Sequence, residues 1–257
     1  MLTDMSFNLR WFAVWQRNFL VWRKLALPSV LGNLADPMIY LFGLGYGLGG
    51  LLPQVGGVSY ITFLAAGTVC ASTMNAATFE SLYSAFSRMQ VQKTWDAILN
   101  APVAMADVVI GEWVWAATKA TLSGGAILLV ISLLGFTRPD LALWALPLVF
   151  LIGLSFAALG LIVTALAPSY DFFMYYFTLL VTPMILLSGV FFPLAQLPPA
   201  AQLLAQLLPL SHAVALVRPL LLGNPVPDLW LHGGVLASVA AVAIVVAIRL
   251  TKRRLLS

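Results

Sequence analysis

The positions of the charged residues constrain the fold of this chain more than any other feature. Only 9% of its 257 residues are charged, whereas a soluble domain carries about 25%. Five long stretches contain no Asp, Glu, Lys or Arg, namely 37–79, 120–137, 141–170, 172–217 and 229–248. Since a membrane-spanning helix needs about 20 mostly apolar residues, this pattern predicts a polytopic membrane protein.

The composition of the apolar stretches favours helices over a membrane barrel. They are rich in Leu, Ala and Val with interrupting Gly and Pro, which is typical of helices in lipid. They lack the alternating strands of roughly ten residues that a barrel requires. We therefore expect an all-α membrane protein with one transmembrane domain over 1–257. Its six predicted membrane spans lie at about 30–50, 58–79, 108–134, 141–166, 172–192 and 229–248.

Basic residues concentrate on one side of this predicted membrane. Ten of them precede the first span, connect the second to the third, or follow the sixth: Arg10, Arg17, Arg23, Lys24, Arg88, Lys93, Arg249, Lys252, Arg253 and Arg254. The opposite side has Arg138 and Arg218. Because cytoplasmic loops carry the excess of Lys and Arg, both termini are predicted to be cytoplasmic, in a bacterial inner membrane.

The segment 7–24 predicts an amphipathic helix at the membrane interface. With 3.6 residues per turn, Phe7, Trp11, Trp15, Phe19 and Trp22 fall on one face. Cations recur every seven residues along the border of that face, at Arg10, Arg17 and Lys24. Such a helix anchors its rings among lipid headgroups. Whether it also contacts a cytoplasmic partner stays open.

The stretch 80–107 is the only long loop predicted on the cytoplasmic side. It is compatible with helix as far as Ala101, because the residue before a proline disfavours helical geometry. Trp95, Ile98 and Leu99 form an apolar edge within it. The segment is either a solvated elbow between two spans or a lever that receives force from a cytoplasmic motor.

The external stretch 188–228 is apolar but contains many prolines, at 193, 198, 199, 209 and 219 among others. A straight span does not tolerate so many. We expect short helices over 193–222 that enter the outer leaflet and return, with protein covering their broken backbone. An ordinary external loop is the alternative.

Motifs for nucleotide hydrolysis, metal chemistry and hydrolase chemistry are missing. No Gly-x-x-x-x-Gly-Lys-Ser/Thr loop occurs, so this chain is not expected to hydrolyse nucleotide. Its single cysteine and its two distant histidines form no metal-binding pattern, and no Gly-x-Ser-x-Gly elbow appears. The formal charge of +4 is dispersed, which argues against nucleic acid as a partner. We therefore expect no catalytic residue and no metal.

Charged and aromatic residues near the spans are the remaining candidates. Glu112 and Lys119 lie two turns apart on a similar helix face, which favours a structural link between them. A Lys119 that reaches the interface or binds substrate is the alternative. Six aromatic residues are candidates for a substrate pathway, or else for packing against protein or lipid: Tyr60, Phe173, Tyr175, Tyr176, Phe191 and Phe192.

Two motifs resemble those of type 2 ABC exporter permeases. The first runs from Thr94 to Pro102 and continues at Gly111-Glu112. The second is external and comprises 187–193 with Leu197-Pro198, Leu208-Pro209-Leu210 and Arg218. With the N-terminal helix, the resemblance covers nearly the whole chain. The run 95–99 is most similar to that of the NodJ-like permeases of nodulation-factor exporters.

The resemblance implies a homodimer of six-span subunits bound to two copies of a separate NodI-like ABC ATPase, which would hold the ATP and Mg. It implies a coupling helix at 82–101 that docks on the ATPase. It also implies that 193–222 closes the exit and that the substrate is an amphiphilic glycan such as a lipo-chitooligosaccharide. The residues assigned to coupling are Glu80, Phe86, Arg88, Thr94, Trp95, Asp96, Ile98 and Leu99.

Three alternatives stay open. The chain is a permease for another polysaccharide, a glycolipid or a drug, or it is a secondary transporter driven by protons or sodium. The third alternative is a membrane enzyme acting on lipid-linked sugar, and the missing catalytic cluster argues against it.

Overall fold

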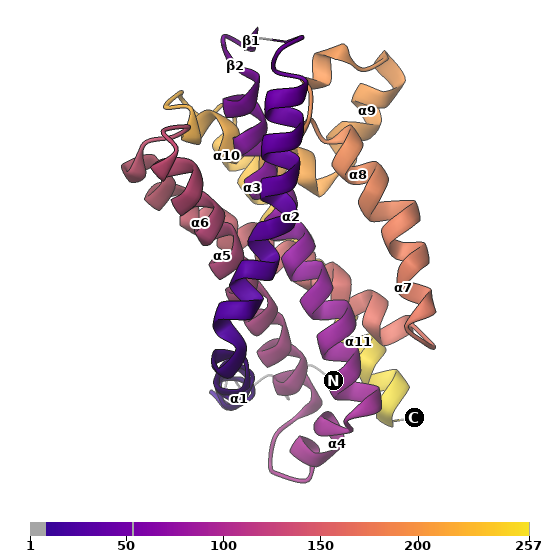
Figure 1. Ribbon diagram of the computed structural model, residues 1–257. Helices are drawn as coiled ribbons and strands as arrows, with labels where there is room; N and C mark the ends of the chain where they lie inside the picture. The colour runs from indigo at the N-terminus through magenta and orange to yellow at the C-terminus, as the bar shows by residue number, and fades with distance from the viewer. Residues whose placement is uncertain (1–8, 53, 257) are drawn as a thin grey trace.

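The computed structural model describes residues 9–52 and 54–256, which form an elongated helical bundle. Helices α2, α3, α5, α6 and α11 run along its length (Figure 1). Helix α1, helix α4 and the C-terminus lie at one end, and a short hairpin and helices α9 and α10 lie at the other. The end with α1 and α4 is therefore the end with most of the basic residues.

Helix α1 (Arg10–Trp22) is separated from α2 (Ala26–Gly47) by a 3-10 turn at Arg23–Leu25. In Figure 1, α1 is seen almost end-on, whereas α2 runs up the bundle. The buried residues of α1 are Val14 and Asn18, and this face packs on α5. The first part of the predicted interface helix, including Phe7, lies outside the described residues.

A two-residue hairpin joins α2 to α3. Strands β1 (Gln54–Val55) and β2 (Val58–Ser59) are antiparallel. Gly56 and Gly57 connect them with φ angles of +62° and +83°, as a tight hairpin turn requires. The side chain of Ser59 then caps α3 (Tyr60–Phe79) by accepting a hydrogen bond from the backbone N–H of Thr62.

The helical path continues beyond α3 through two π segments, at Glu80–Ser84 and Ser87–Val91. It ends where Lys93 adopts a left-handed φ of 54°. The short helix α4 (Thr94–Leu99) follows in a new direction. The predicted coupling helix at 82–101 therefore does not form as one continuous helix, because the left-handed Lys93 divides the segment in two.

Helices α5 (Met105–Leu133), α6 (Pro139–Leu166) and α11 (Leu229–Leu256) complete the centre of the bundle. Small residues allow them to pack closely: a Cβ atom added to Gly153 would lie only 3.1 Å from Cα of Ala117 in α5. This is the packing mode typical of membrane helices.

Helices α7 (Asp171–Tyr176) and α8 (Thr182–Leu187) flank a third π segment, Phe177–Val181, and stand on one side of the bundle. A 3-10 turn at Leu194–Gln196 leads to α9 (Pro199–Leu207) and α10 (Pro209–Leu221). These two helices are bent by 89° relative to each other. Prolines at the start of both helices agree with the break.

Four helical segments of the described chain are long and apolar enough to cross a membrane: Arg10–Gly47, Met105–Leu133, Pro139–Leu166 and Leu229–Leu255. A fifth is added if the bent pair α9–α10 counts as one span. Helix α3 contains polar Thr, Ser and Asn residues and is almost entirely buried in protein, so it does not need a lipid-facing surface. The segment Asp171–Leu187 is shorter than an ordinary span. The all-α membrane class is thus supported, while the count of six spans stays a prediction.

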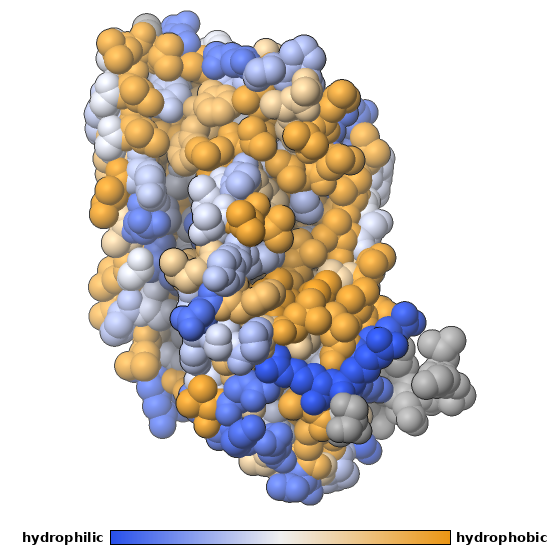
Figure 2. Space-filling model, turned by 90° about the vertical axis from the view of Figure 1, so that its right-hand side faces the viewer, coloured by the Kyte–Doolittle hydropathy of each residue, from blue (hydrophilic) through white to orange (hydrophobic). Residues whose placement is uncertain are grey.

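The surface agrees with this arrangement. Figure 2 shows apolar residues over much of one face and hydrophilic residues gathered toward the end of α1 and α4.

Candidate functional site

Four ionisable side chains form a largely buried network between the helical extension of α3 and helix α5. Arg88 donates from Nη2 to Oε1 of Glu80 at 2.9 Å and from Nε to Oε1 of Glu112 at 2.9 Å. Lys119 donates from Nζ to Oε2 of Glu80 at 2.7 Å. Glu80 is 4% and Glu112 is 1% exposed. Two carboxylates and two cations thus compensate one another inside the protein.

The predicted contact between Glu112 and Lys119 does not form. Each of the two residues pairs instead with a residue of the extension of α3. Lys119 pairs with Glu80, and Glu112 pairs with Arg88. Seven helical residues correspond to a rise of roughly 10 Å, so a direct contact within α5 would be long. The extension of α3 passes alongside α5 instead and brings a partner to each of the two charges.

Two indole groups complete the network. Nε1 of Trp95 donates to Oε1 of Glu112 at 3.0 Å, and Nε1 of Trp115 donates to Oε1 of Glu80 at 2.8 Å. Trp95 is 1% exposed, so of the three residues predicted to form an apolar edge it lies inside the protein, whereas Ile98 and Leu99 are partly exposed. Because Trp95 belongs to α4, this hydrogen bond attaches α4 to α5.

The opposing charges decide the ionisation of Glu80, which follows the last residue of α3. Burial alone would raise the pKa of this carboxyl group, but the positive charges of Arg88 and Lys119 lower its pKa to about 2. Glu80 is therefore ionised at neutral pH. A buried ion pair contributes little net stability, but removal of one partner leaves an unpaired buried charge.

Of the other residues assigned to coupling, some are exposed or partly exposed and one is buried. Asp96 is exposed and lies 4.0 Å from Lys93, while Thr94, Ile98 and Leu99 are partly exposed. Phe86 is 4% exposed and belongs to an aromatic cluster with Tyr83, Tyr170 and Phe173. This cluster joins the extension of α3 to the start of α7. The exposed part of the predicted coupling segment is thus the outer face of α4.

Helix α1 is attached to the same region by its polar side-chain groups. Arg10 donates from Nη1 to the carbonyl oxygen of Pro102 at 2.7 Å, just after α4. Nε1 of Trp15 donates to Oγ1 of Thr118 at 3.1 Å. The ring of Trp22 packs edge-on against Trp115 of α5 at 5.9 Å, whereas Trp11 contacts its neighbour Phe12 within α1 at 6.0 Å. The predicted interface residues therefore bind protein as well as facing outward.

The side chain of Arg17 in α1 lies at the edge of the charge network. Its Nη1 donates to Oδ1 of the adjacent Asn18 at 2.9 Å. Together with Glu80, Arg88 and Lys119, both residues line a cavity of about 180 Å³.

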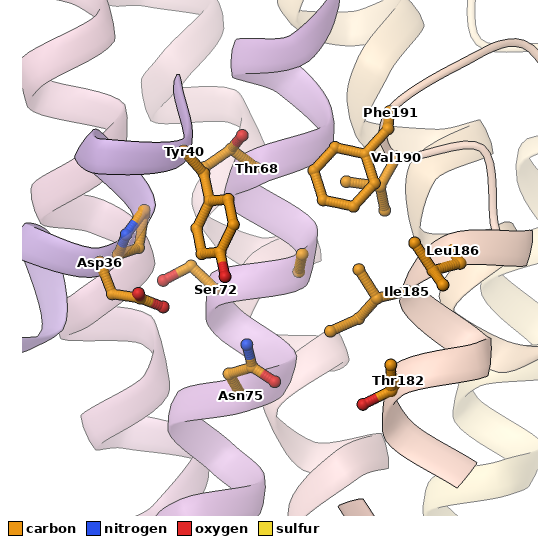
Figure 3. A pocket seen from close by; sticks show the side chains of 12 residues that line it. Asp36, Tyr40, Thr68, Ser72, Asn75, Thr182, Ile185, Leu186, Val190 and Phe191 are labelled. Atoms are coloured by element: carbon orange, nitrogen blue, oxygen red, sulfur yellow. The ribbon is translucent and has the colours of Figure 1, made fainter. Parts of the chain in front are cut away.

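A second candidate site is a polar cleft near the middle of the bundle, with a volume of about 280 Å³. Figure 3 shows side chains of α2 and α3 facing those of α8 and Phe191 across it. Its polar residues are Asp36, Tyr40, Thr68, Ser72, Asn75 and Thr182. A neighbouring hollow of about 350 Å³ shares Asp36, Ser72 and Asn75 and extends the cleft along α2 and α3.

Sequence reasoning missed this cleft, although a signal was present. Thr68, Ser72 and Asn75 follow the spacing i, i+4, i+7, which places them on one helix face, and Asp36 and Tyr40 are four residues apart. Hydrogen-bonding groups along an apolar wall suit a ligand with both polar and apolar parts.

The six aromatic residues predicted for a substrate pathway are not brought together. Of these, Phe191 lines the cleft. Tyr60 at the start of α3 and Phe173 in α7 are buried, Tyr176 is 9% exposed and Tyr175 is 64% exposed. Phe192 is partly exposed beside Phe191. For Phe173 and Tyr60, packing against protein is therefore a better explanation than a role in the substrate pathway.

Comparisons with known proteins identify the family of this chain. Residues 10–222 match the family described as ABC-2 type transporter. The chain is 54% identical over 249 residues to Nodulation protein J of Rhizobium leguminosarum bv. viciae, covering 97% of this chain and 96% of that protein. It is 52% identical over 246 residues to Nodulation protein J of Rhizobium meliloti (strain 1021), covering 96% and 94%.

A more distant relative is the Inner membrane transport permease YadH of Escherichia coli (strain K12), which is 27% identical over 241 residues, or 91% of this chain and 93% of that protein. These matches confirm the resemblance to type 2 ABC permeases inferred from the motifs. The chain therefore belongs to the ABC-2 type transporter family, as a multi-pass membrane permease that is similar over nearly its whole length to Nodulation protein J.

Proposed function

We propose that this permease is the membrane part of an ATP-driven exporter for an amphiphilic glycan, such as a lipo-chitooligosaccharide. Membership of the ABC-2 family implies an ABC ATPase partner, and the names of the relatives connect them with nodulation. The observation that carries the proposal is the attachment of α4 to the membrane helices by Trp95, Glu112 and Arg88.

The coupling mechanism follows from this attachment. The partner ATPase docks on the outer face of α4, which presents Thr94, Asp96, Ile98 and Leu99. A displacement of α4 moves Trp95 and with it the carboxylate of Glu112 on α5. Arg88 and Glu80 carry the displacement to the extension of α3. Because the side chains of the network are buried and hydrogen-bonded to one another, a displacement of one of them moves the others.

The substrate takes the cleft between α2, α3 and α8. The polar groups of the cleft bind hydroxyl and amide groups of a glycan, and the apolar wall of the cleft binds an acyl chain. Ile39 of α2 and Leu179, just before α8, are exposed apolar side chains on the helical segments that line or adjoin the cleft. The proposed assembly is a homodimer in which a second copy of the chain encloses the cleft, bound to two NodI-like ATPase subunits.

In the proposed orientation, the chain crosses a bacterial inner membrane and both of its termini lie on the cytoplasmic side. Helix α1, helix α4 and the C-terminus share the end where the basic residues concentrate. The broken helices α9 and α10 then lie on the outer side and close the exit.

The proposal is tested with inside-out membrane vesicles that contain the permease and its co-purifying ATPase. Uptake of a labelled lipo-chitooligosaccharide is expected to require ATP and to persist when an ionophore collapses the ion gradients. A near-stoichiometric ATPase should also co-purify with the tagged chain in mild detergent. Uptake without nucleotide would contradict the ATP-driven mechanism.

One observation favours a second candidate, an ion-driven transporter. Asp36 is a carboxylate on an apolar helix, and it faces the polar cleft, where an intramembrane charge is often functional. This candidate predicts that Asp36→Asn abolishes transport and that an ionophore does the same. The ABC mechanism predicts that transport by the D36N variant still responds to ATP.

A further inference from the structure

Helix α1 borders two further cavities, which are separate from the cleft proposed for the substrate. The inner cavity is the one of about 180 Å³ that is lined by Arg17, Asn18, Lys119 and Arg88, together with Glu80. An open hollow of about 540 Å³ lies against the outer side of Arg17 and is lined also by Arg23 and Lys24. Because Arg17 and Val21 line both spaces, they are two parts of one site.

The charges of this site do not balance. Both carboxylates of the buried network are already paired, Glu80 with Arg88 and Lys119, and Glu112 with Arg88. Within residues 9–52 and 54–256, Arg17 makes no salt bridge. The outer hollow adds two more exposed cations, and none of its lining residues is acidic. The site therefore has an excess of positive charge.

An unused hydrogen-bond donor lies beside Arg17. Asn18 is 3% exposed, and its Oδ1 accepts from Arg17. Its Nδ2 has no hydrogen-bond partner among the described residues. A buried amide N–H without a partner is costly. Since Asn18 lines the inner cavity, this amide and the Arg17 guanidinium are placed to donate to one anionic group.

We propose that this site binds the phosphate headgroup of an anionic phospholipid from the cytoplasmic leaflet. The phosphate oxygens accept from Arg17 and Asn18 in the inner cavity, and the rest of the headgroup lies against Arg23 and Lys24. Exposed apolar side chains beside the outer hollow suit the acyl chains, namely Leu20, Val21, Leu25 and Leu27. Anionic lipids attract basic segments at this membrane surface.

The lipid would then join α1 to the buried charge network. Lys119 and Arg88 line the inner cavity from α5 and from the extension of α3, so a bound phosphate contacts all three elements at once. Headgroup binding stabilises the packing of α1 on the helices that move with α4. This role is independent of the substrate and of the direction of transport.

The test uses the purified full-length permease alone, without ATPase or substrate, so its outcome does not depend on the proposed function. Retention of phosphatidylglycerol and of zwitterionic phosphatidylcholine is measured by native mass spectrometry. The wild-type protein is expected to retain phosphatidylglycerol preferentially. The Arg17→Gln variant should bind it about fivefold more weakly, since one cation near the surface contributes on the order of that factor.

Matched variants separate the site from net charge. Arg10→Gln removes the same charge from the same helix but outside both cavities, and it should retain phosphatidylglycerol normally. Arg17→Lys should restore most of the retention. If R17Q does not remain folded by size-exclusion chromatography, the exposed Lys24→Gln variant replaces it, with a smaller loss expected.

Two outcomes would overturn the proposal. Equal retention of phosphatidylglycerol by the wild type, R17Q and K24Q would show that the lipid does not bind at this site. Displacement of phosphatidylglycerol by inorganic phosphate at similar concentration would show that the site takes a free anion, because the acyl chains would then contribute nothing.

Discussion

Nε1 of Trp95 lies 3.0 Å from Oε1 of Glu112, so a buried hydrogen bond attaches the six-residue helix α4 to helix α5. The two residues are 17 positions apart, and the intervening chain passes through the turn at Ala101-Pro102. Movement of α4 by a bound partner must therefore displace this bond or carry Glu112 with it.

The first prediction concerns that hydrogen bond. Trp95→Phe keeps an aromatic ring but removes the N–H donor, which leaves Glu112 with Arg88 as its partner. We expect the ATPase to bind normally while ATP-driven transport falls several-fold relative to ATP hydrolysis. Trp144→Phe, at an exposed position of α6, is the control. An unchanged ratio of transport to hydrolysis in W95F would argue against force transmission through this bond.

The second prediction compares a buried cation with an exposed one. Arg88→Met leaves Glu80 and Glu112 without their shared partner, and such a loss costs about 3–5 kcal/mol. Lys93→Met removes a cation whose side chain is 60% exposed and 4.0 Å from Asp96, where a pair contributes only about 0–1 kcal/mol. Thermal unfolding in detergent should show a large loss for R88M and almost none for K93M.

The third prediction concerns pH. The pKa of Glu80 is lowered from 4.5 to about 2 by Arg88 and Lys119. A carboxyl group with a lowered pKa contributes stability that is fully present above its unfolded pKa and is lost as pH falls toward its folded pKa. The wild type should therefore keep this contribution at pH 6–8 and lose it between about pH 4.5 and 2.

The Glu80→Gln variant provides the comparison. It should unfold more easily than the wild type at neutral pH, and the difference between the two should shrink below about pH 4. Thermal unfolding measured across this range checks the expectation. A constant difference at every pH would mean that the ionised form of Glu80 is not the stabilising one.

The fourth prediction concerns the polar cleft. Asn75→Leu preserves side-chain size but removes the amide from the cleft wall, so glycan transport should fall while ATPase assembly is retained. Tyr175→Ala is the matched comparison, because Tyr175 is exposed and does not line the cleft. If Y175A reduces export as much as N75L does, the substrate follows the aromatic residues instead.

Much of the candidate site was within reach of the sequence. The motif around Trp95 pointed to coupling, and the periodicity of Arg10 and Arg17 pointed to an amphipathic helix at the interface. The second inference uses a local pattern, in which the spacing of residues along one helix determines the face on which they lie, whereas the first rests on the resemblance to type 2 ABC permeases. The partners of those residues were harder to predict. Lys119 binds Glu80, which is 39 positions away, and nothing in the spacing within α5 indicates that choice.

The membrane class of the protein follows from its sequence alone. Long charge-free stretches can be buried only in lipid or in protein, and the uneven distribution of cations predicts their orientation. The sequence does not indicate how α3 extends through π segments to bring Glu80 and Arg88 beside α5, or how α2, α3 and α8 enclose a polar cleft. The physical reason is that hydropathy is a property of each segment, whereas hydrogen bonds and ion pairs between helices depend on how those segments are placed against one another.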